Sequence, residues 1–260
     1  MKVSIITVCY NSEATIENTI KSVVLQTYAD IEYIIIDGKS SDATLDIVSK
    51  YQDKIAKVIS EPDQGIYDAM NKGIEEATGD IVGILNSDDY YVGDDVVGTI
   101  ANAFKQNSPD LVFADLAYVK ADNQDKILRY YGAKNFKPKM LKCGIMPPHP
   151  TLYVKKEIYE TYGNYRLDFK IASDYEMFVR LLLVNKLSYY YINKCIIKMT
   201  VGGISTSNFD SKKIINIETI KALSVNGINV SYLSIFRKYP KKVFEIIKGR
   251  LMTLFQVGIK

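Results

Sequence analysis

The sequence contains no tryptophan, one histidine and three cysteines in 260 residues. The cysteines, Cys9, Cys143 and Cys195, are widely separated, so they predict neither a disulfide framework nor a paired metal site. No apolar run approaches the roughly 18–20 residues that span a bilayer. The chain enters a strand-like run at Val3 without the layout of a signal peptide. Together these absences predict a cytoplasmic protein.

Basic residues are concentrated at the C-terminal end of the chain. Residues 231–260 contain seven lysines or arginines and one acid, which gives this tail a net charge of +6. The whole chain has a formal net charge of +3, which leaves −3 for the rest. A slightly acidic body argues against a general nucleic-acid-binding protein, so we expect no nucleic-acid partner.

Short apolar runs rich in β-branched residues alternate with helical patterns over residues 1–114. Because the runs lack polar alternation, they are typical of strands buried on both faces of a sheet. The helical patterns between them have Ser12 as a predicted N-cap and Gly79 as a predicted stop. The predicted strands are Val3–Val8, Ile31–Ile36, Ala56–Ile59, Ile81–Leu85 and Asp110–Phe113. This alternation predicts an α/β fold with a mostly parallel central sheet flanked by helices.

The alternation of strand-like runs and helical patterns ends after residue 114. A hairpin is predicted over Leu116–Arg129 with its turn around Asp122-Asn123-Gln124, followed by an irregular stretch over Pro138–Pro150. Helices are expected near 155–162 and from 174 to 185, strands near 187–192 and 195–199, and C-terminal helices from about 209 to 225 and from 232 onward.

Carboxylates follow the predicted strands at the points where the strands end. Asp37, Asp63 and the pair Asp88-Asp89 come after the second, third and fourth strands. Since ligands bind beyond the carboxyl ends of parallel strands, these side chains are candidate binding residues. Ordinary turn chemistry is the other interpretation of each position. Two adjacent acids repel each other unless a cation neutralises them, so we predict a Mg²⁺ or Mn²⁺ site at Asp88-Asp89.

Four motifs in order resemble glycosyltransferase family 2. They are Val3–Asn11, Ile36–Asp42, Glu61–Gly73 and Asn86–Asp89. The sequence lacks the Gly-x-Gly-x-x-Gly and Gly-x-x-x-x-Gly-Lys motifs of dinucleotide and P-loop sites. The resemblance implies the GT-A fold, an inverting reaction, and a nucleotide-sugar donor bound with Mg²⁺ or Mn²⁺. It also implies a catalytic domain over residues 1–205, with a nucleotide-sugar-binding half (1–114) and an acceptor-binding half (115–205). Residues 206–260 form a predicted basic, amphipathic helical extension.

The resemblance also assigns roles to individual residues. It places Tyr10 near the nucleobase, Asp37 at the base or ribose, and Asp88 at the metal and diphosphate, with Asp89 sharing the metal. The family's Asp-x-Asp triplet begins with Asn86 here, which weakens the contact usually made by its first acid. The implied nucleotide-binding residues are Val8, Tyr10, Asp37, Asp63, Ser87 and Asp88.

An inverting transfer needs a general base opposite the leaving group. The resemblance gives this role to Asp174, at the start of a predicted helix. A structural interpretation is also open, because Ser173 and Glu176 match a capping box and an acid suits the first turn of a helix. The single histidine, His149, belongs either to a proline-rich structural loop or, as in relatives, to the acceptor or diphosphate side.

The processive polymerases of this family carry Gln-x-x-Arg-Trp, which this chain lacks, so we expect addition of a single sugar. We predict an inverting glycosyltransferase with a UDP-sugar donor that builds a bacterial O-antigen, capsule or exopolysaccharide. One alternative is a sugar nucleotidyltransferase, which would need a Gly-rich basic loop after the first strand. The other is a nucleotide-sugar-binding module without catalysis, which the presence of both Asp88 and Asp174 disfavours.

Apolar residues recur at nearly helical spacing from Leu233 to Phe255, with lysines and arginines among them and Pro240 suited to a helix start. Packing on the catalytic body explains this pattern, and so does a helix lying on the anionic inner face of the cell membrane. The second interpretation suits a saccharide acceptor carried on a polyprenyl diphosphate. It predicts a cytoplasmic protein held peripherally at the membrane.

Overall fold

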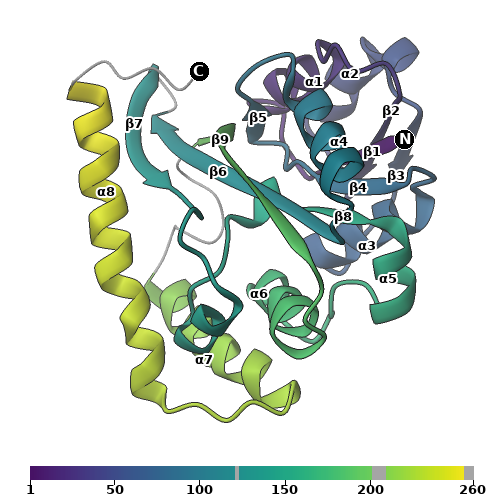
Figure 1. Ribbon diagram of the computed structural model, residues 1–260. Helices are drawn as coiled ribbons and strands as arrows, with labels where there is room; N and C mark the ends of the chain where they lie inside the picture. The colour runs from purple at the N-terminus through teal and green to yellow at the C-terminus, as the bar shows by residue number, and fades with distance from the viewer. Residues whose placement is uncertain (121–122, 201–208, 255–260) are drawn as a thin grey trace.

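The computed structural model describes residues 1–120, 123–200 and 209–254 (Figure 1). Within these residues, nine strands form one sheet in the order β3-β2-β1-β4-β8-β6-β9-β5, and β7 pairs with β6 beside this path. The strands are β1 (Val3–Cys9), β2 (Ile31–Asp37), β3 (Lys57–Ser60), β4 (Ile81–Ile84), β5 (Asp89–Tyr91), β6 (Leu111–Lys120), β7 (Asn123–Tyr131), β8 (Tyr153–Lys155) and β9 (Tyr189–Thr200).

Helices cover both faces of the sheet (Figure 1). The α-helices of the described residues are α1 (Ile16–Val24), α2 (Thr44–Ser49), α3 (Ile66–Glu76), α4 (Val96–Asn107), α5 (Lys156–Tyr162), α6 (Ser173–Phe178), α7 (Phe209–Val225) and α8 (Lys238–Leu254). Shorter helical segments are η1 (Gln52–Lys54), η2 (Pro138–Cys143), η3 (His149–Thr151), the π-helical η4 (Val179–Val184) and η5 (Tyr232–Arg237).

The first four strands are parallel, as predicted. β1 pairs with β2 on one side and β4 on the other, and β3 pairs with β2. The later strands make the sheet mixed, because β8 runs antiparallel to both β4 and β6, β7 runs antiparallel to β6, and β5 runs antiparallel to β9. The chain builds outward from β1 to β3 and then crosses back to β4. Strand order therefore reverses between β1 and β4, which is where open α/β sheets hold their ligands.

Polar and apolar residues do not alternate in β1 because the strand is buried on both faces of the sheet. Ile5 belongs to a cluster with Ile16 of α1 and Ile100 of α4, while the next residue, Ile6, belongs to a cluster with Met70 of α3. All five of these side chains are at most 2% exposed. The prediction of two-sided burial is wrong for β3, whose Val58 is 42% exposed, because β3 is an edge strand covered on fewer sides.

Several local predictions differ from the structure. Ser12 is not the cap of α1, since the helix begins at Ile16 and Thr15 precedes it without a side-chain cap. The helix expected from 174 to 185 begins as α6 and continues as η4, and the two strands expected at 187–192 and 195–199 are the single strand β9. β9 has an irregularity in its pairing with β6 after Ile192, which explains the apparent break. The predicted hairpin is formed by β6 and β7, but Asn123 and Gln124 of its predicted turn belong to strand β7, and Asp122 lies outside the described residues.

The C-terminal helices pack on the rest of the protein. Ala222 and Leu223 of α7 are fully buried in the cluster that contains α6 residues. Helix α8 runs alongside β7 (Figure 1), and its Glu245 accepts hydrogen bonds from Arg129 at 2.6–2.8 Å. The predicted boundary at residues 205/206 and the predicted helix end, including Phe255, lie outside the described residues. No helix of the described residues is long and apolar enough to cross a membrane.

Candidate active site

Hydrogen bonds join the loops that follow three neighbouring parallel strands. The Ser12 hydroxyl, after β1, lies 2.9 Å from the Ser87 hydroxyl, after β4. Asn11 donates its backbone N–H to the Ser40 hydroxyl, after β2, at 2.8 Å, and its side-chain oxygen accepts from the Ser41 N–H at 2.9 Å. The carboxyl ends of β1, β2 and β4 therefore form one connected rim at the point where strand order reverses.

Asp37 lies beneath this rim rather than on its surface. Its carboxylate is fully buried and accepts hydrogen bonds from the Ser40 hydroxyl and N–H and from the Ser60 hydroxyl, all at 2.5–3.0 Å. Each of these partners is neutral. Asp37 thus holds the loops after β2 and β3 together, and direct contact with a nucleotide stays a prediction.

Tyr10 and Asp63 meet over Gly38. A Cβ added at Gly38 would overlap the Asp63 carboxylate and lie 3.4 Å from the Tyr10 ring. The Tyr10 side chain is 64% exposed, so its ring is available for stacking, and Val8 beneath it is buried. Gly38, which follows Asp37, leaves room for the Asp63 side chain from the loop after β3. Recognition of the base by Asp63 stays a prediction.

Asn86, Asp88 and Asp89 follow β4. Asp89 is fully buried and accepts a hydrogen bond from the Asn86 amide at 3.2 Å, while Asn86 Oδ1 and Asp89 Oδ1 have no hydrogen-bond partner. Burial raises the pKa of Asp88, and burial together with the Asp88 charge raises that of Asp89 well above its usual value. Unpartnered oxygen atoms and crowded carboxylates suit a hard divalent cation. The described residues contain no group of three or more His, Cys, Asp or Glu side chains that could hold a metal unaided, so such a cation would need ligand oxygens as well.

Asp174 begins helix α6 in the second half of the chain. Its side chain is half-buried, and its carboxylate accepts hydrogen bonds from the Tyr175 N–H at 2.7 Å and from the Tyr67 hydroxyl at 3.4 Å. Burial raises the pKa of Asp174 to about 6. This carboxylate is therefore ionised at neutral pH and has a proton affinity suited to a general base.

Tyr67 connects the two halves of the site. It enters α3 directly after the loop that carries Asp63, and its hydroxyl donates to the Ile171 carbonyl at 2.5 Å, just before α6. Tyr118 of β6 lies within electrostatic reach of both halves. Burial raises its pKa, Arg129 opposes that rise, and the negative charges of Asp89 and Asp174 add to it.

The profile of glycosyl transferase family 2 matches residues 4–163, more than half of the chain. This chain belongs to glycosyl transferase family 2. It is a glycosyltransferase, and the four motifs that resemble the family lie at the connected rim described above.

Relatives and solved structures agree with this family assignment. An uncharacterized glycosyltransferase of Mycobacterium tuberculosis is 35% identical over 184 residues, which cover 70% of this chain and 69% of the relative. Residues 1–349 of S. aureus TarS, solved with UDP-GlcNAc, superpose with a TM-score of 0.69 and 18% identity over 98% of this chain and 73% of that fragment. The mannosyltransferase PcManGT of Pyrobaculum calidifontis, solved with GDP-Man and Mn²⁺, gives a TM-score of 0.59 and 15% identity over 98% of this chain and 87% of that protein. The fold is the GT-A fold of these glycosyltransferases.

The capping box that the sequence pattern of Ser173 and Glu176 matches is not formed at the start of α6. Ala172 is the N-cap without a side-chain bond, and the Ser173 hydroxyl donates instead to the Arg166 carbonyl. Glu176 is fully buried and pairs with Arg180 at 3.0 Å. The Arg180 guanidinium also donates to carbonyls of residues 162–164, so the Glu176 pair fixes that loop.

Glu218 of α7 holds the backbone segment that precedes α6, and local sequence patterns did not predict this contact. Its carboxylate accepts hydrogen bonds from three consecutive backbone N–H groups, those of Lys170, Ile171 and Ala172, at 2.7–2.9 Å. These residues lead directly into α6, so Glu218 fixes the backbone that presents Asp174. The contact spans 46–48 residues of sequence, which is why no spacing rule could reveal it.

His149 is buried in the second half of the glycosyltransferase. Its Nε2 lies 2.7 Å from the Tyr165 hydroxyl, and the Tyr165 ring stacks on Tyr67 at 5.7 Å between centroids. Burial lowers the pKa of His149 to about 4, so the imidazole is neutral at physiological pH. Its contact with acceptor or diphosphate stays a prediction, while its observed neighbours lead toward Asp174.

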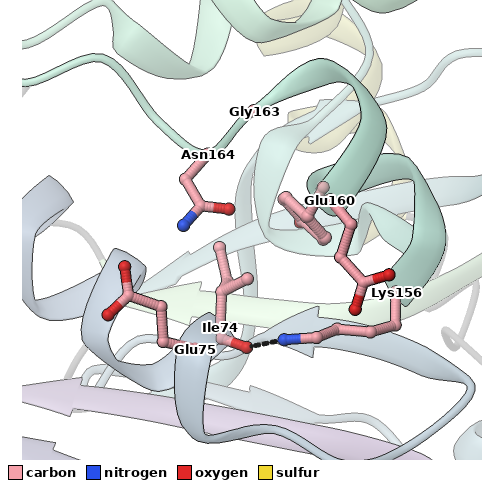
Figure 2. A pocket seen from close by; sticks show the side chains of 7 residues that line it. Ile74, Glu75, Lys156, Glu160, Gly163 and Asn164 are labelled. Carbon is pink, nitrogen blue, oxygen red and sulfur yellow. Dashed lines mark hydrogen bonds between the residues drawn. The ribbon is translucent and has the colours of Figure 1, made fainter.

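A cavity of about 220 Å³ lies at the other end of α3 from this rim (Figure 2). Figure 2 shows Glu75, Glu160, Lys156 and Asn164 around it, with the Lys156 ammonium donating to the Ile74 carbonyl. The cavity adjoins the start of β4, where Lys156 N–H also bonds the Asp80 carbonyl. It is therefore separate from the loops at the carboxyl ends of the strands.

Replacing Glu218 by alanine should destabilise the protein by about 1–3 kcal/mol, because three backbone donors lose their acceptor. The free energy of unfolding, measured in urea, checks this expectation. Ile217→Ala on the same helix is the control, since Ile217 is 52% exposed and its loss should change stability by less than about 0.5 kcal/mol. Equal stability of Glu218→Ala and wild type would contradict the anchoring role.

Proposed function

We propose that this glycosyltransferase moves a single sugar from a nucleoside-diphosphate sugar, a UDP-sugar by preference, to an acceptor hydroxyl with inversion of the anomeric carbon. Two observations carry the proposal: the connected rim at the ends of β1, β2 and β4, and the hydrogen bonds by which Tyr67, which follows the Asp63 loop, reaches Asp174 and the backbone before it. Structures of TarS with UDP-GlcNAc and of PcManGT with GDP-Man are consistent with such a donor.

On the donor side, the exposed Tyr10 ring stacks against the nucleobase, and Asp63 accepts hydrogen bonds from the base or ribose. Asp37 holds together the loops after β2 and β3, the second of which carries Asp63, and Val8 is buried in β1. Ser87, bonded to Ser12, keeps the loop after β4 close to the nucleotide. The resemblance to the family suggested these roles, and the proximity of Tyr10 and Asp63 at Gly38 supports them.

Asp88 and Asp89 are the residues that would hold Mg²⁺ or Mn²⁺ beside the diphosphate. The unpartnered oxygens of Asn86 and Asp89 support this assignment, and Mn²⁺ accompanies GDP-Man in PcManGT. When bound, a divalent cation stabilises the negative charge that develops on the departing diphosphate. The protein's part is to place carboxylate oxygens at that point before the sugar–phosphate bond breaks.

Asp174 serves as the general base that takes the proton of the acceptor hydroxyl. Tyr67 and the Tyr175 N–H orient its carboxylate, and Glu218 holds the preceding backbone. Attack from the side opposite the diphosphate inverts the anomeric carbon. His149 would act on the acceptor side through Tyr165, to which it is bonded.

We further propose a role in making a bacterial surface polysaccharide, an O-antigen, capsule or exopolysaccharide, on an acceptor carried by a polyprenyl diphosphate. In this proposal the protein is cytoplasmic and binds the inner face of the membrane peripherally. Support comes from the exposed apolar side chains of α8, among them Phe244 (67% exposed) and Leu254 (75%). Because the Glu245 side of α8 packs on β7, surface substitutions test this role better than truncation of the helix.

Asp88→Ala should weaken Mn²⁺-dependent binding of UDP by at least about tenfold, a loss of roughly 1.4 kcal/mol or more. Calorimetric titration with UDP, with and without Mn²⁺, measures this. Asp94→Ala removes an exposed acid nearby and should bind as wild type does. If Asp88→Ala retains wild-type affinity in Mn²⁺, Asp88 is not a metal ligand.

Asp174→Asn should leave donor affinity nearly unchanged and lower turnover by about 10²–10⁴-fold, because asparagine keeps both hydrogen bonds but cannot accept a proton. Since the base must be ionised and its pKa is about 6, the wild-type rate should fall as the pH drops below about 6. The residual rate of the variant should lack this acid limb. A pH-rate profile of each protein checks both points, and an unchanged acid limb in Asp174→Asn would assign the titration to another group.

A further inference from the structure

Two segments that are nearly free of acids meet on one side of the protein. Residues 126–156 contain eight lysines and arginines and no aspartate or glutamate. Residues 219–254 contain Glu245 as their single acid, and this carboxylate is buried against Arg129. η2 comes from the first segment and η5 from the second. The Ser234 hydroxyl of η5 donates to the Lys142 carbonyl of η2 at 3.3 Å, so the two basic segments are in direct contact.

A cavity of about 440 Å³ lies between η2 and η5. Its cationic lining consists of Lys139 and Lys142 from η2 and Arg237 from η5, and its apolar lining includes Met140 and Val230. Lys139, Lys142 and Arg237 are exposed, and within residues 1–120, 123–200 and 209–254 none of them pairs with a carboxylate. Three cations around one cavity repel each other, and an anion bound between them would relieve that repulsion.

The next residue along the chain shows the same crowding of positive charge. Lys238 is 8% exposed, and burial lowers its pKa to about 8, with the charge of Lys242 adding to the effect. Phosphate is the anion best matched to such a group, because arginine binds it in a bidentate manner and lysine binds it as a point charge.

Apolar side chains project from the same element that lines the cavity. Leu233 and Phe236 of η5 are 77% and 43% exposed. On α8, which runs along the outer side of β7 (Figure 1), exposed apolar residues recur at the spacing of one helix face: Phe244, Ile247, Leu251 and Leu254. A basic cavity beside apolar side chains matches a lipid, which has an anionic headgroup and an apolar tail.

We propose that the cavity between η2 and η5 binds the phosphate group of an anionic membrane lipid, with Lys139, Lys142 and Arg237 as its cationic contacts. This inference rests on the peripheral membrane binding proposed above and extends it from the tail to η2 in the catalytic half. The protein would then meet the bilayer through two elements, which fixes its orientation as well as its attachment.

The test is co-sedimentation of the full chain, at low salt, with phosphatidylcholine vesicles that contain or lack phosphatidylglycerol. The double variant Lys139→Gln/Lys142→Gln leaves η5 and α8 unchanged. Because each basic contact near an anionic surface strengthens binding several-fold, the pair should lower affinity for phosphatidylglycerol vesicles by roughly 30-fold. Lys50→Gln/Lys54→Gln removes the same charge from exposed positions elsewhere and should bind within about twofold of wild type.

Each outcome decides the inference. Wild-type affinity in Lys139→Gln/Lys142→Gln, or an equal loss in the control pair, would overturn it while leaving tail-mediated membrane binding intact. Failure of the wild type to bind anionic vesicles would overturn both the lipid site between η2 and η5 and membrane binding by the tail. The sugar-transfer proposal is tested separately, by measuring release of nucleoside diphosphate. If inorganic pyrophosphate in solution binds the wild type at this cavity and vesicles do not, the ligand is a soluble phosphate and the lipid assignment is wrong.

Discussion

The central constraint of this structure is the gathering of carboxylates at one sheet edge without cationic partners. Parallel pairing of β1 with β2 and β4 brings the loops with Asp37 and Asp88 to one rim, and Asp63 reaches it from β3. No lysine or arginine among the described residues pairs with these three carboxylates. Serine hydroxyls satisfy Asp37, but two oxygens after β4 have no partner. Such an edge is costly until a ligand or cation arrives, which makes it suited to binding rather than to stability.

The second half of the chain completes the site through contacts that are distant in sequence. Tyr67 reaches from α3 to the backbone before α6, and Glu218 reaches the same backbone from α7. Both hold the segment that presents Asp174, so the proposed base is fixed from two sides. Helix α7 lies beyond the region that the family profile matches, yet it buries Ala222 and Leu223 in the core shared with α6. The division between catalytic domain and C-terminal extension at residue 205 stays a prediction, and α7 contributes directly to the catalytic half.

The sequence predicted features that depend on local pattern. β-Branched runs located the four parallel strands, and because ligands gather at the ends of such strands, Asp37, Asp63 and Asp88 could be predicted at one rim. Features set by tertiary contact were missed. Ser12 looked like a helix cap but bonds to Ser87, 75 residues away. Glu176 looked like part of a capping box but pairs with Arg180. The antiparallel insertion of β8 between β4 and β6 depends on pairing partners that no local window contains.

The central claim is that this rim and Asp174 together break the bond between a sugar and a nucleoside diphosphate. The most direct measurement is ³¹P NMR of the full-length protein with Mn²⁺ and a panel of UDP-, dTDP- and GDP-sugars, with water as the acceptor. The account predicts slow accumulation of nucleoside diphosphate from one of these donors. Release of pyrophosphate or nucleoside monophosphate would show a different bond breaking, and a donor that binds without being consumed would reduce the protein to a binding module. Either result would contradict the account.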